Sequence, residues 1–328
     1  MSDSTNRIVT LARHEFRFAV RSRVLIVLLG IVVTVTAVSV YIASVDYASK
    51  LADYEAYRSA AQAGGVDRIA PSPLAALSLL RGAMEYLEII GAVIAIALGY
   101  LTVSRERTNR TLPLIRSRPV TSGELATGNL LGALGVFATL IGVTAIVGIV
   151  CVGTIGRDWI NATQALKLLL GYLAALAYMG SFYCLGAIAT AKARVGVNGL
   201  MIALGIWLVV VLVLPQIGDT MDADNQLPGG LFKALGLGHS GEVQILTHFS
   251  TYERIRTWTE EASLAKHVER FAFAMTDVKE RYRSFSLPRL LGQTRNDIGW
   301  LIAYSSAMYV GLRRTFRTTP TIPHGGTS

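Results

Sequence analysis

The sequence alternates long apolar runs with shorter polar segments, most of which are basic. Five runs carry almost no charge: 24–44, 83–103, 130–152, 168–190 and 197–217. Each is close to the roughly 20 residues that a helix rising ~1.5 Å per residue needs to cross a hydrocarbon core of ~30 Å. A sixth and shorter run covers 298–312. The pattern predicts an all-α integral membrane protein with six transmembrane helices.

Composition supports the membrane class. Apolar residues make up 52% of the 328 residues, and the mean hydropathy is +0.45. A soluble domain of ordinary composition cannot bury that much apolar surface. The first run, 24–44, is longer than the ~7 to 15 apolar residues typical of a signal peptide, so we interpret it as a membrane anchor.

The net charge of +9 is unevenly distributed along the chain. If the N-terminus is cytoplasmic, about half of the 31 Lys and Arg residues fall in cytoplasmic segments, with Asp3, Glu15, Glu106 and Glu124 as the acids there. This distribution follows the positive-inside rule. We therefore expect a multi-pass protein of the plasma membrane with both termini in the cytoplasm, and we attribute the basic charge to membrane orientation rather than to nucleic-acid binding.

The segment before the first run is patterned as an amphipathic helix. Arg13, Arg17 and Arg21 recur at i, i+4 and i+8. The opposite face carries Ile8, Leu11, Ala12, Phe16, Ala19 and Val20. Such a helix is expected to lie in the membrane interface, with its arginines at lipid phosphates and its apolar face in the acyl boundary. An ordinary helical cytoplasmic flank is the alternative.

Residues 45–80 are expected to form a first outer loop, and the second span then opens with two acids. Arg81 and Glu85 are four residues apart on one helical face. Glu85 and Glu88 are candidates for an outer vestibule, because an acid within a span tends to face an aqueous cavity or a partner. Both residues also lie near the expected interface, where simple solvation of a helix end explains them equally well.

Residues 218–297 are expected to be extracytoplasmic and helical. Apolar residues recur at spacings of 3 and 4 from Leu264 to Phe285, which predicts one amphipathic helix. Thr257 and Glu260 have capping-box spacing before this helix, and Pro288 follows it. The helix would dock on the outer ends of the spans, on its mate in a dimer, or on an extracytoplasmic partner.

Motifs for catalysis are missing from the sequence. The phosphate-binding pattern G-x-x-x-x-G-K-[ST] is absent, as are the zinc-protease and serine-hydrolase patterns. Cys151 and Cys184 fall in apolar runs without metal-ligand spacing. We therefore nominate no catalytic, metal-binding or cofactor-binding residue, and we do not expect the chain to be an enzyme.

The segment SRERTNRTLPLIRSRPVTSGELATGNLLG, residues 104–132, joins the second and third spans. Thr121 and Glu124 have the spacing of a capping box that starts the third helix. Leu112, Leu114 and Ile115 form a small apolar patch among arginines. A solvated loop needs no such patch, whereas a short helix that fills a groove on a partner protein does.

This segment, together with the Ala-Arg-His-Glu-Phe helix before the first span, resembles the permease subunits of type-2 ATP-binding cassette (ABC) exporters. The resemblance implies six spans, an interfacial elbow helix over 7–23, and a coupling helix over 106–117. It also implies a second, smaller cytoplasmic contact at 192–196, and ATP with Mg bound by a partner ATPase rather than by this chain. The sequence departs from the family pattern at two places: Arg110-Thr111 replaces the usual Gly-Thr after Glu106, and Gly128-Asn129 replaces Gly-Lys.

These observations favour a permease subunit that forms the translocation pathway of an ATP-driven exporter. We expect three parts: 1–217 with the elbow, five spans and a coupling loop at 104–129; the outer segment 218–297; and 298–328 with the sixth span and tail. Two permease copies, identical or homologous, would pair with two cytoplasmic ATPase subunits. A membrane scaffold or sensor and a secondary transporter are the alternatives, although mid-span ion-coupling acids are missing. The residues predicted to couple to the ATPase are Glu106, Leu112, Leu114, Ile115 and Arg116, followed by Arg118 and Glu124.

Overall fold

A computed structural model of the chain describes residues 2–64, 75–108, 121–221, 234–236, 250–278 and 280–318. The described residues fold into helices without a β-strand among them. The helices are α1 (Ser2–Arg21), α2 (Arg23–Ala63), η1 (Ala76–Leu80), α3 (Arg81–Tyr86), η2 (Leu87–Gly91), α4 (Ala92–Thr108), α6 (Ser122–Thr154), α7 (Ala162–Lys192), α8 (Gly196–Trp207), η3 (Leu208–Val213), α9 (Leu214–Met221), α12 (Ser250–Glu261), α13 (Leu264–Met275), α14 (Glu280–Arg283), α15 (Leu287–Gln293) and α16 (Arg295–Thr318).

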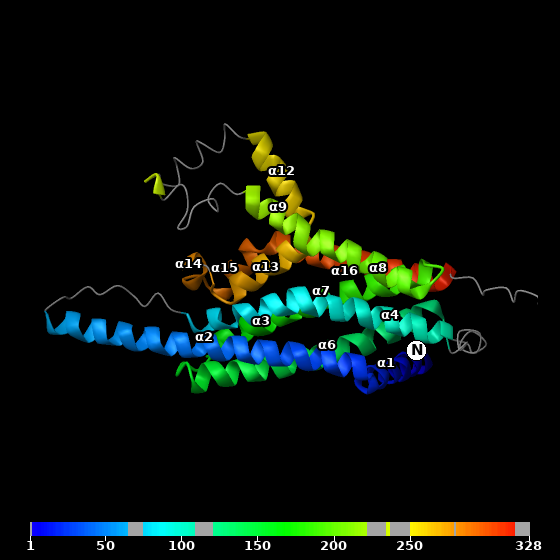
Figure 1. Cartoon of the computed structure of the whole chain (residues 1–328), viewed down its shortest axis with the longest axis horizontal. Coiled ribbons are helices and arrows are strands. Elements are labelled where there is room, and N and C mark those ends of the chain that lie inside the picture. The colour runs from blue at the N-terminus through cyan, green and yellow to red at the C-terminus, as the bar shows by residue number, and fades with distance from the viewer. Residues whose placement is uncertain are drawn as a thin grey trace, which may run out of the picture.

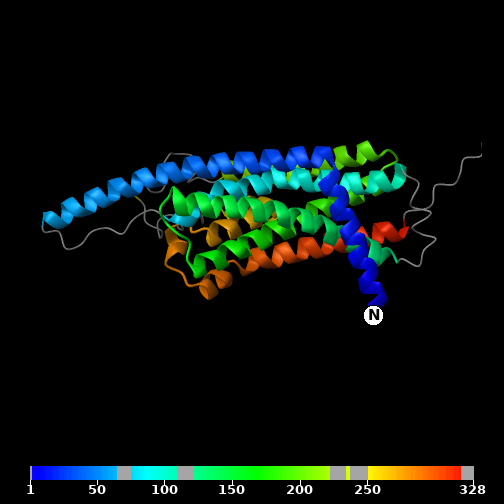
Figure 2. The same ribbon diagram turned by 90° about the horizontal axis from the view of Figure 1, so that it is seen from below.

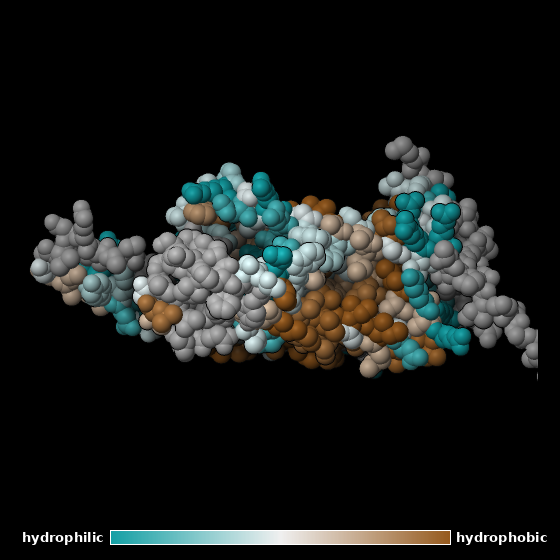
Figure 3. All heavy atoms as spheres, turned by 90° about the horizontal axis from the view of Figure 1, so that it is seen from above, coloured by the Kyte–Doolittle hydropathy of each residue, from teal (hydrophilic) through white to brown (hydrophobic). Residues whose placement is uncertain are grey.

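Long apolar helices run side by side through the molecule (Figures 1 and 2). Five of them are long and apolar enough to cross a membrane: Ile26–Ala63, Ala76–Arg107, Ser122–Thr154, Ala162–Lys192 and Gly196–Met221. One face of the molecule shows a hydrophobic band across its middle with hydrophilic residues toward both ends (Figure 3). The prediction of a multi-pass, all-α membrane protein is therefore confirmed.

Helix α16 corresponds to the short sixth run of the sequence. It has 24 residues, about 36 Å at ~1.5 Å per residue, so its length matches a bilayer core. It packs against α7 and α6 along the bundle. Its apolar content is too low to place it among the five candidate spans, so the predicted sixth crossing is not established by composition.

Helix α7 lies at the centre of the bundle and contacts α4, α6, α8, α13 and α16. Tyr178 and Tyr183 are among its largest fully buried side chains. Tyr178 donates its hydroxyl to the carbonyl of Glu88 at 2.9 Å, within the π-helix η2. In a second π-helix, η3, the carbonyl of Val210 accepts a hydrogen bond from the Ser263 hydroxyl at 2.6 Å. These two side chains satisfy carbonyl groups where the helices are locally widened.

The expectation of an outer loop over residues 45–80 was wrong for its first part. Helix α2 continues without interruption to Ala63 and extends past the other helices of the bundle (Figures 1 and 2). Alanines are frequent there, and Asp46 pairs with Lys50 one turn later at 2.7 Å. Hydropathy therefore marked where the apolar part of the helix ends, not where the helix ends.

The prediction of one helix from Leu264 to Phe285 was also wrong. Helix α13 ends at Met275, because Asp277 adopts the left-handed conformation, with φ of 54°. The amide of Val278 bonds to the carbonyl of Phe273 at 3.2 Å, which is the hydrogen bond of a Schellman C-cap. The buried ammonium of Lys167 holds the Asp277 carboxylate at 2.9 Å. A contact from another helix thus stabilises the break in the apolar stripe.

Two further expectations for the outer segment were wrong. Thr257 lies inside α12 rather than at a helix start, and Ser263 is the residue that caps α13. Pro288 lies in the first turn of α15, where proline is tolerated, rather than after a helix end. Ten of the twelve residues of α13 are buried, and the helix packs against α7 and α16 of the same chain.

The segments predicted to be cytoplasmic lie at one end of the bundle (Figures 1 and 2). This end contains α1, the end of α4, the start of α6, the turn between α7 and α8, and the end of α16. Helices α13, α14 and α15 lie toward the opposite end. The proposed part boundaries at 217 and 297 fall inside α9 and α16, and the division into three parts stays a prediction.

Candidate functional site at the base of the 109–120 loop

The loop predicted to contact an ATPase leaves the bundle at the end of α4 and returns at the start of α6. Thr121 caps α6, because its hydroxyl accepts a hydrogen bond from the Glu124 amide at 3.2 Å, while the Glu124 carboxylate accepts one from the Thr121 amide at 2.8 Å. The predicted capping box is confirmed. Residues 109–120 lie outside the described part of the chain, and with them the predicted coupling residues Leu112, Leu114, Ile115, Arg116 and Arg118.

Three consecutive residues in the last turn of α4 contact three different helices. Arg105 binds Glu15 of α1, Glu106 binds Asn129 of α6, and the Arg107 side chain reaches the end of α7. Successive side chains on a helix are rotated by about 100°, because the helix has 3.6 residues per turn. This rotation lets Arg105, Glu106 and Arg107 point in three directions and attach the loop base to three helices.

The contact between α1 and α4 is a buried ion pair. The Glu15 side chain is 1% exposed and the Arg105 side chain 17%, with 2.8 Å between Arg105 Nη2 and Glu15 Oε2. The other Glu15 oxygen accepts a hydrogen bond from the Thr102 hydroxyl. The Arg105 guanidinium also lies 3.9 Å from the centre of the Phe18 ring. Removing one partner would leave a buried charge uncompensated, which is strongly destabilising.

The contact between α4 and α6 joins Glu106 to Asn129, and Asn129 is one of the residues at which this chain departs from the family pattern. Asn129 donates its amide to the Glu106 carboxylate at 3.2 Å, and both residues are buried. Glu106 is only 4% exposed, so in the described structure its partner is within the chain rather than on a docking surface. Any coupling role of Glu106 would therefore act through the geometry of the loop base.

Arg107 binds the C-terminal end of α7. Its guanidinium donates to the carbonyl of Ala193 at 2.9 Å and also to that of Ala191. Carbonyl groups at a helix C-terminus have no partners within the helix and carry partial negative charge, which favours a cation there. The bonds attach the loop base to the turn at 193–195, which lies within the second cytoplasmic contact, 192–196, that the resemblance implies.

Helix α1 packs tightly on α6 through glycines. A Cβ atom at Gly132 would lie 2.6 Å from both the Ala12 carbonyl oxygen and Glu15 Cβ, and one at Gly128 would lie 2.5 Å from Leu11 Cβ. Arg7 adds an ion pair to Glu124 at 3.1 Å. Small residues of α6 therefore allow α1 to approach it closely.

The predicted arrangement of α1 needs one correction. Arg13, Arg17 and Arg21 are exposed, as expected. The face that carries Phe16 packs on α6 at Gly135, so it faces protein and not only the acyl boundary. The helix separates from α2 at Ser22 and crosses the bundle obliquely (Figure 2).

Glu15 was not among the predicted site residues. Its position follows the packed face of α1, at Ile8, Leu11, Ala12, Glu15 and Ala19. An acid within an apolar helical stripe needs a partner when the stripe is buried, and this spacing is visible in the sequence. The identity of the partner, Arg105, was not visible, because 90 residues separate the two in the chain.

The two acids proposed for an outer vestibule lie near the other end of the bundle. Glu85 pairs with Arg81 at 2.6 Å, and both side chains are exposed to a large degree. Glu88 is half-buried in the π-helix η2. Neither observation tests the vestibule, which stays a prediction.

Helix α13 carries several charged contacts at this end of the bundle. Lys266 binds Asp219 of α9 at 2.9 Å and Glu269 at 3.0 Å. Burial opposes the charge of Lys266, and the two carboxylates outweigh this penalty, so that the pKa of Lys266 is raised. His267 and Arg270 both bind Asp297 at the start of α16. These pairs attach α13 to its neighbours.

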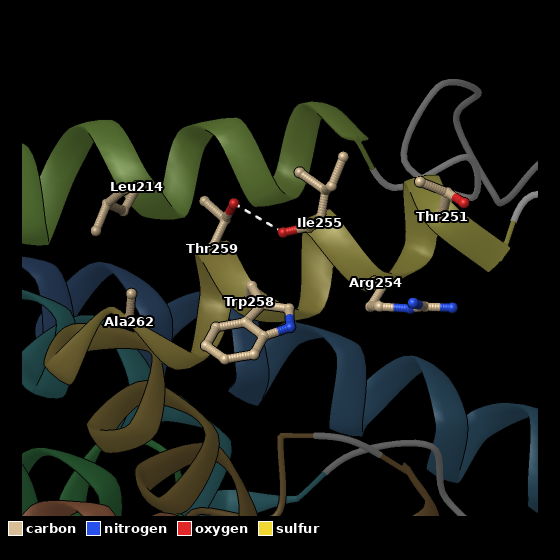
Figure 4. A pocket seen from close by; sticks show the side chains of 7 residues that line it. All are labelled: Leu214, Thr251, Arg254, Ile255, Trp258, Thr259 and Ala262. Atoms are coloured by element: carbon tan, nitrogen blue, oxygen red, sulfur yellow. Dashed lines mark hydrogen bonds between the residues drawn. The ribbon is translucent and has the colours of Figure 1, made fainter.

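A cavity of about 500 Å³ lies between α9 and α12 (Figure 4). Leu214 faces it from α9, and Arg254, Ile255 and Trp258 face it from α12. The Thr259 hydroxyl bonds to the Ile255 carbonyl at 2.9 Å within the same helix. The lining is largely apolar and lacks a pair of acid and base groups, so it presents a surface for contacts rather than for catalysis.

The described residues contain no cluster of His, Cys, Asp and Glu that could hold a metal ion. The polar groups at the base of the 109–120 loop are instead bound to one another across α1, α4, α6 and α7. Such an arrangement connects helices mechanically.

A family model described as "ABC-2 family transporter protein" matches residues 9–310. A search of curated proteins finds no match. The matched range includes most of α1, the loop base and most of α16. The chain therefore belongs to the ABC-2 family of transporter proteins.

Proposed function

We propose that the chain is the permease subunit of an ATP-driven exporter, and that a separate cytoplasmic ATPase docks on the loop between α4 and α6. Membership of the ABC-2 family makes the chain a membrane permease that associates with an ABC ATPase subunit. The direction of transport, the docking loop and the six crossings are parts of the proposal.

The observation that carries the proposal is the attachment of the loop base to three helices by Arg105, Glu106 and Arg107. A loop that only joined two spans would not need buried charged contacts at its base. A loop that receives force from a partner does, because the force must reach the helices that line the pathway. Movement of the loop would then displace the ends of α1, α4, α6 and α7 together.

Two copies of the permease, or this chain and a homologue, would enclose the pathway, with one ATPase on each. ATP binding would close the ATPases and push on the two loops, and ATP with Mg would remain on the partner chains. The spans would then tilt and expose the pathway to the other side of the membrane. Both termini would lie in the cytoplasm, since the basic segments gather at one end of the bundle.

The test is purification of the full-length chain from its native membrane in mild detergent, followed by identification of bound proteins and an ATPase assay. We expect a nucleotide-binding subunit in a one-to-one ratio with the permease. The double variant Leu112→Asp/Ile115→Asp should lose this subunit, because two carboxylates would occupy an apolar docking surface.

The matched control is Leu235→Asp/Ile255→Asp, which makes the same kind of change at exposed apolar residues far from the loop. We expect this variant to keep the ATPase. Retention of the ATPase at the wild-type ratio by Leu112→Asp/Ile115→Asp would show that the docking assignment is wrong. Purification of the chain without any nucleotide-binding protein would favour a membrane scaffold or a secondary transporter.

A further inference from the structure

A cleft of about 390 Å³ lies between the C-terminal turns of α16 and the start of α6, at the same end of the bundle as α1. Its lining is strongly basic for its size. The residues are Ser122, Tyr309, Val310, Arg313, Arg314 and Arg317. The Tyr309 hydroxyl hydrogen bonds to that of Thr127 at 2.7 Å and so connects α16 to α6 beside the cleft.

Two of the three arginines that line this cleft have no carboxylate partner among the described residues. Arg313 and Arg317 form no ion pair with any carboxylate in the described part of the chain. Two acids of this end are already engaged, since Glu124 binds Arg7 and Glu15 binds Arg105. The neighbouring sequence segments 109–120 and 319–328 contain neither Asp nor Glu, so they add no acidic side chain.

The position of Arg313 adds to the excess of positive charge in the cleft. A Cβ atom at Gly123 would lie 3.2 Å from Arg313 Nε, so the guanidinium lies against the first turn of α6. The N-terminus of a helix carries partial positive charge, and a cation beside it is unfavourable. An anion between the two would reverse the sign of this interaction, and amide groups at a helix start bind phosphate well.

The exposed face of α16 indicates where such an anion would come from. Ile302 and Val310 are exposed on the same side of the helix as Arg313 and Arg317, so a short apolar stripe of two residues, interrupted by Ser306, leads to the arginines. A phospholipid matches this arrangement, because its acyl chains would contact the apolar residues and its phosphate would lie at the arginines. A soluble phosphate or an acidic protein surface would not need the apolar stripe.

We propose that this cleft binds the phosphate headgroup of an anionic phospholipid from the cytoplasmic leaflet, with Arg313 and Arg317 as the main contacts. Guanidinium groups bind phosphate oxygens in pairs of hydrogen bonds. The lipid would hold the end of α16 against the start of α6, next to the base of the 109–120 loop. The lipid site goes beyond the proposed permease function. The two proposals have one requirement in common, which is that α16 crosses the membrane.

The test is native mass spectrometry of the delipidated full-length protein, titrated separately with phosphatidylglycerol and phosphatidylcholine. Wild type should prefer phosphatidylglycerol. Arg313→Gln/Arg317→Gln should lose at least about tenfold in affinity for phosphatidylglycerol, the effect of losing one charge-assisted hydrogen bond. Arg313→Lys/Arg317→Lys should retain part of the affinity, because it keeps the charge without the paired geometry.

The matched control is Arg289→Gln/Arg295→Gln, which removes two exposed arginines near the opposite end of α16 and should leave the affinity unchanged. Equal phosphatidylglycerol affinity in Arg313→Gln/Arg317→Gln and wild type would overturn the proposal. Displacement of the lipid by an equal concentration of inorganic phosphate would also overturn it, because the ligand would then be a free anion.

Bound ATPase is measured in the same preparations. Loss of the ATPase in Arg313→Gln/Arg317→Gln with unchanged lipid affinity would assign the cleft to the protein partner and overturn the lipid site. Selective lipid binding in preparations that never contain an ATPase would support the lipid site, while the proposed permease function would fail.

Discussion

Glu15, Arg105 and Glu106 are charged side chains inside a largely apolar protein, and each has a partner on another helix. Burial removes the water that would solvate these charges, so an unpaired one would be very costly. Paired, they fix how α1, α4 and α6 meet. At the scale of single residues, the base of the loop is therefore defined by partners rather than by the loop itself.

The first residue-scale prediction concerns the pair of Glu15 and Arg105. We expect Glu15→Gln and Arg105→Gln each to lower the free energy of unfolding markedly, and the double variant to lose less than the two losses added. The coupling energy should be about 1–3 kcal/mol, because the two side chains share one buried contact. The measurement is a double-mutant cycle by denaturant unfolding in mixed micelles.

The exposed pair of Arg81 and Glu85 provides the control cycle. Its side chains are 53% and 40% exposed, so solvent screening should reduce the coupling energy to less than about 1 kcal/mol. Coupling of equal size in the two cycles would contradict the interpretation that burial of Glu15 makes its contact strong.

At the scale of elements, the packing of α1 on α6 determines the shape of the basic end of the bundle. The two helices approach closely because Gly128 and Gly132 present no side chain to α1. The Glu15 side chain lies at this contact, so close packing and the ion pair to Arg105 depend on each other. A change in the spacing of α1 and α6 would displace the Glu15 carboxylate.

The element-scale prediction is that Gly132→Ala destabilises the protein by about 1–3 kcal/mol, the usual cost of an overpacked contact. The new Cβ atom would lie 2.6 Å from the Ala12 carbonyl oxygen. The measurement is the free energy of unfolding, together with the rate of proteolysis within α1.

Gly142→Ala is the control on the same helix, because a Cβ atom there has no neighbour within 4 Å. Alanine favours helix more than glycine, so we expect this variant to be neutral or slightly stabilised. If both variants behaved alike, close packing of α1 on α6 would not limit stability.

At the scale of the whole molecule, the two ends of the bundle differ in chemistry. One end gathers the basic ends of α1, α4 and α16, while the other carries the extension of α2 and the charged contacts of α13. This polarity is the basis for placing the first end in the cytoplasm.

The molecule-scale prediction concerns this orientation. In a variant with Cys151 and Cys184 replaced by serine, a cysteine at Tyr57, which is 61% exposed on α2, should react with a membrane-impermeant thiol reagent in intact cells. Cysteines at His14 and Thr327 should react only after permeabilisation. Labelling of Thr327→Cys in intact cells, with His14→Cys protected, would mean that α16 does not complete a sixth crossing.

The apolar runs predicted the existence of the long helices well, and the capped start of α6 was read correctly from Thr121 and Glu124. The prediction failed where helices continue into water, as α2 does to Ala63. It also failed where a contact from another helix determines where a helix ends. Helix α13 ends just before Asp277, and Lys167 of α7 binds the Asp277 carboxylate. The candidate coupling residues Leu112, Leu114 and Ile115 stay predictions.

The sequence by itself determined the membrane class, the approximate spans and the gathering of positive charge, because these depend on composition and on periodicity along the chain. The resemblance to the family was also visible in the sequence, in residues 104–132 and in the helix before the first span. The tertiary structure alone decided that Arg105, Glu106 and Arg107 reach α1, α6 and α7, and that α6 covers part of the apolar face of α1. The physical reason is that a buried charge pairs with, and a glycine packs against, the residue that lies beside it in space. The distance along the sequence does not identify that residue.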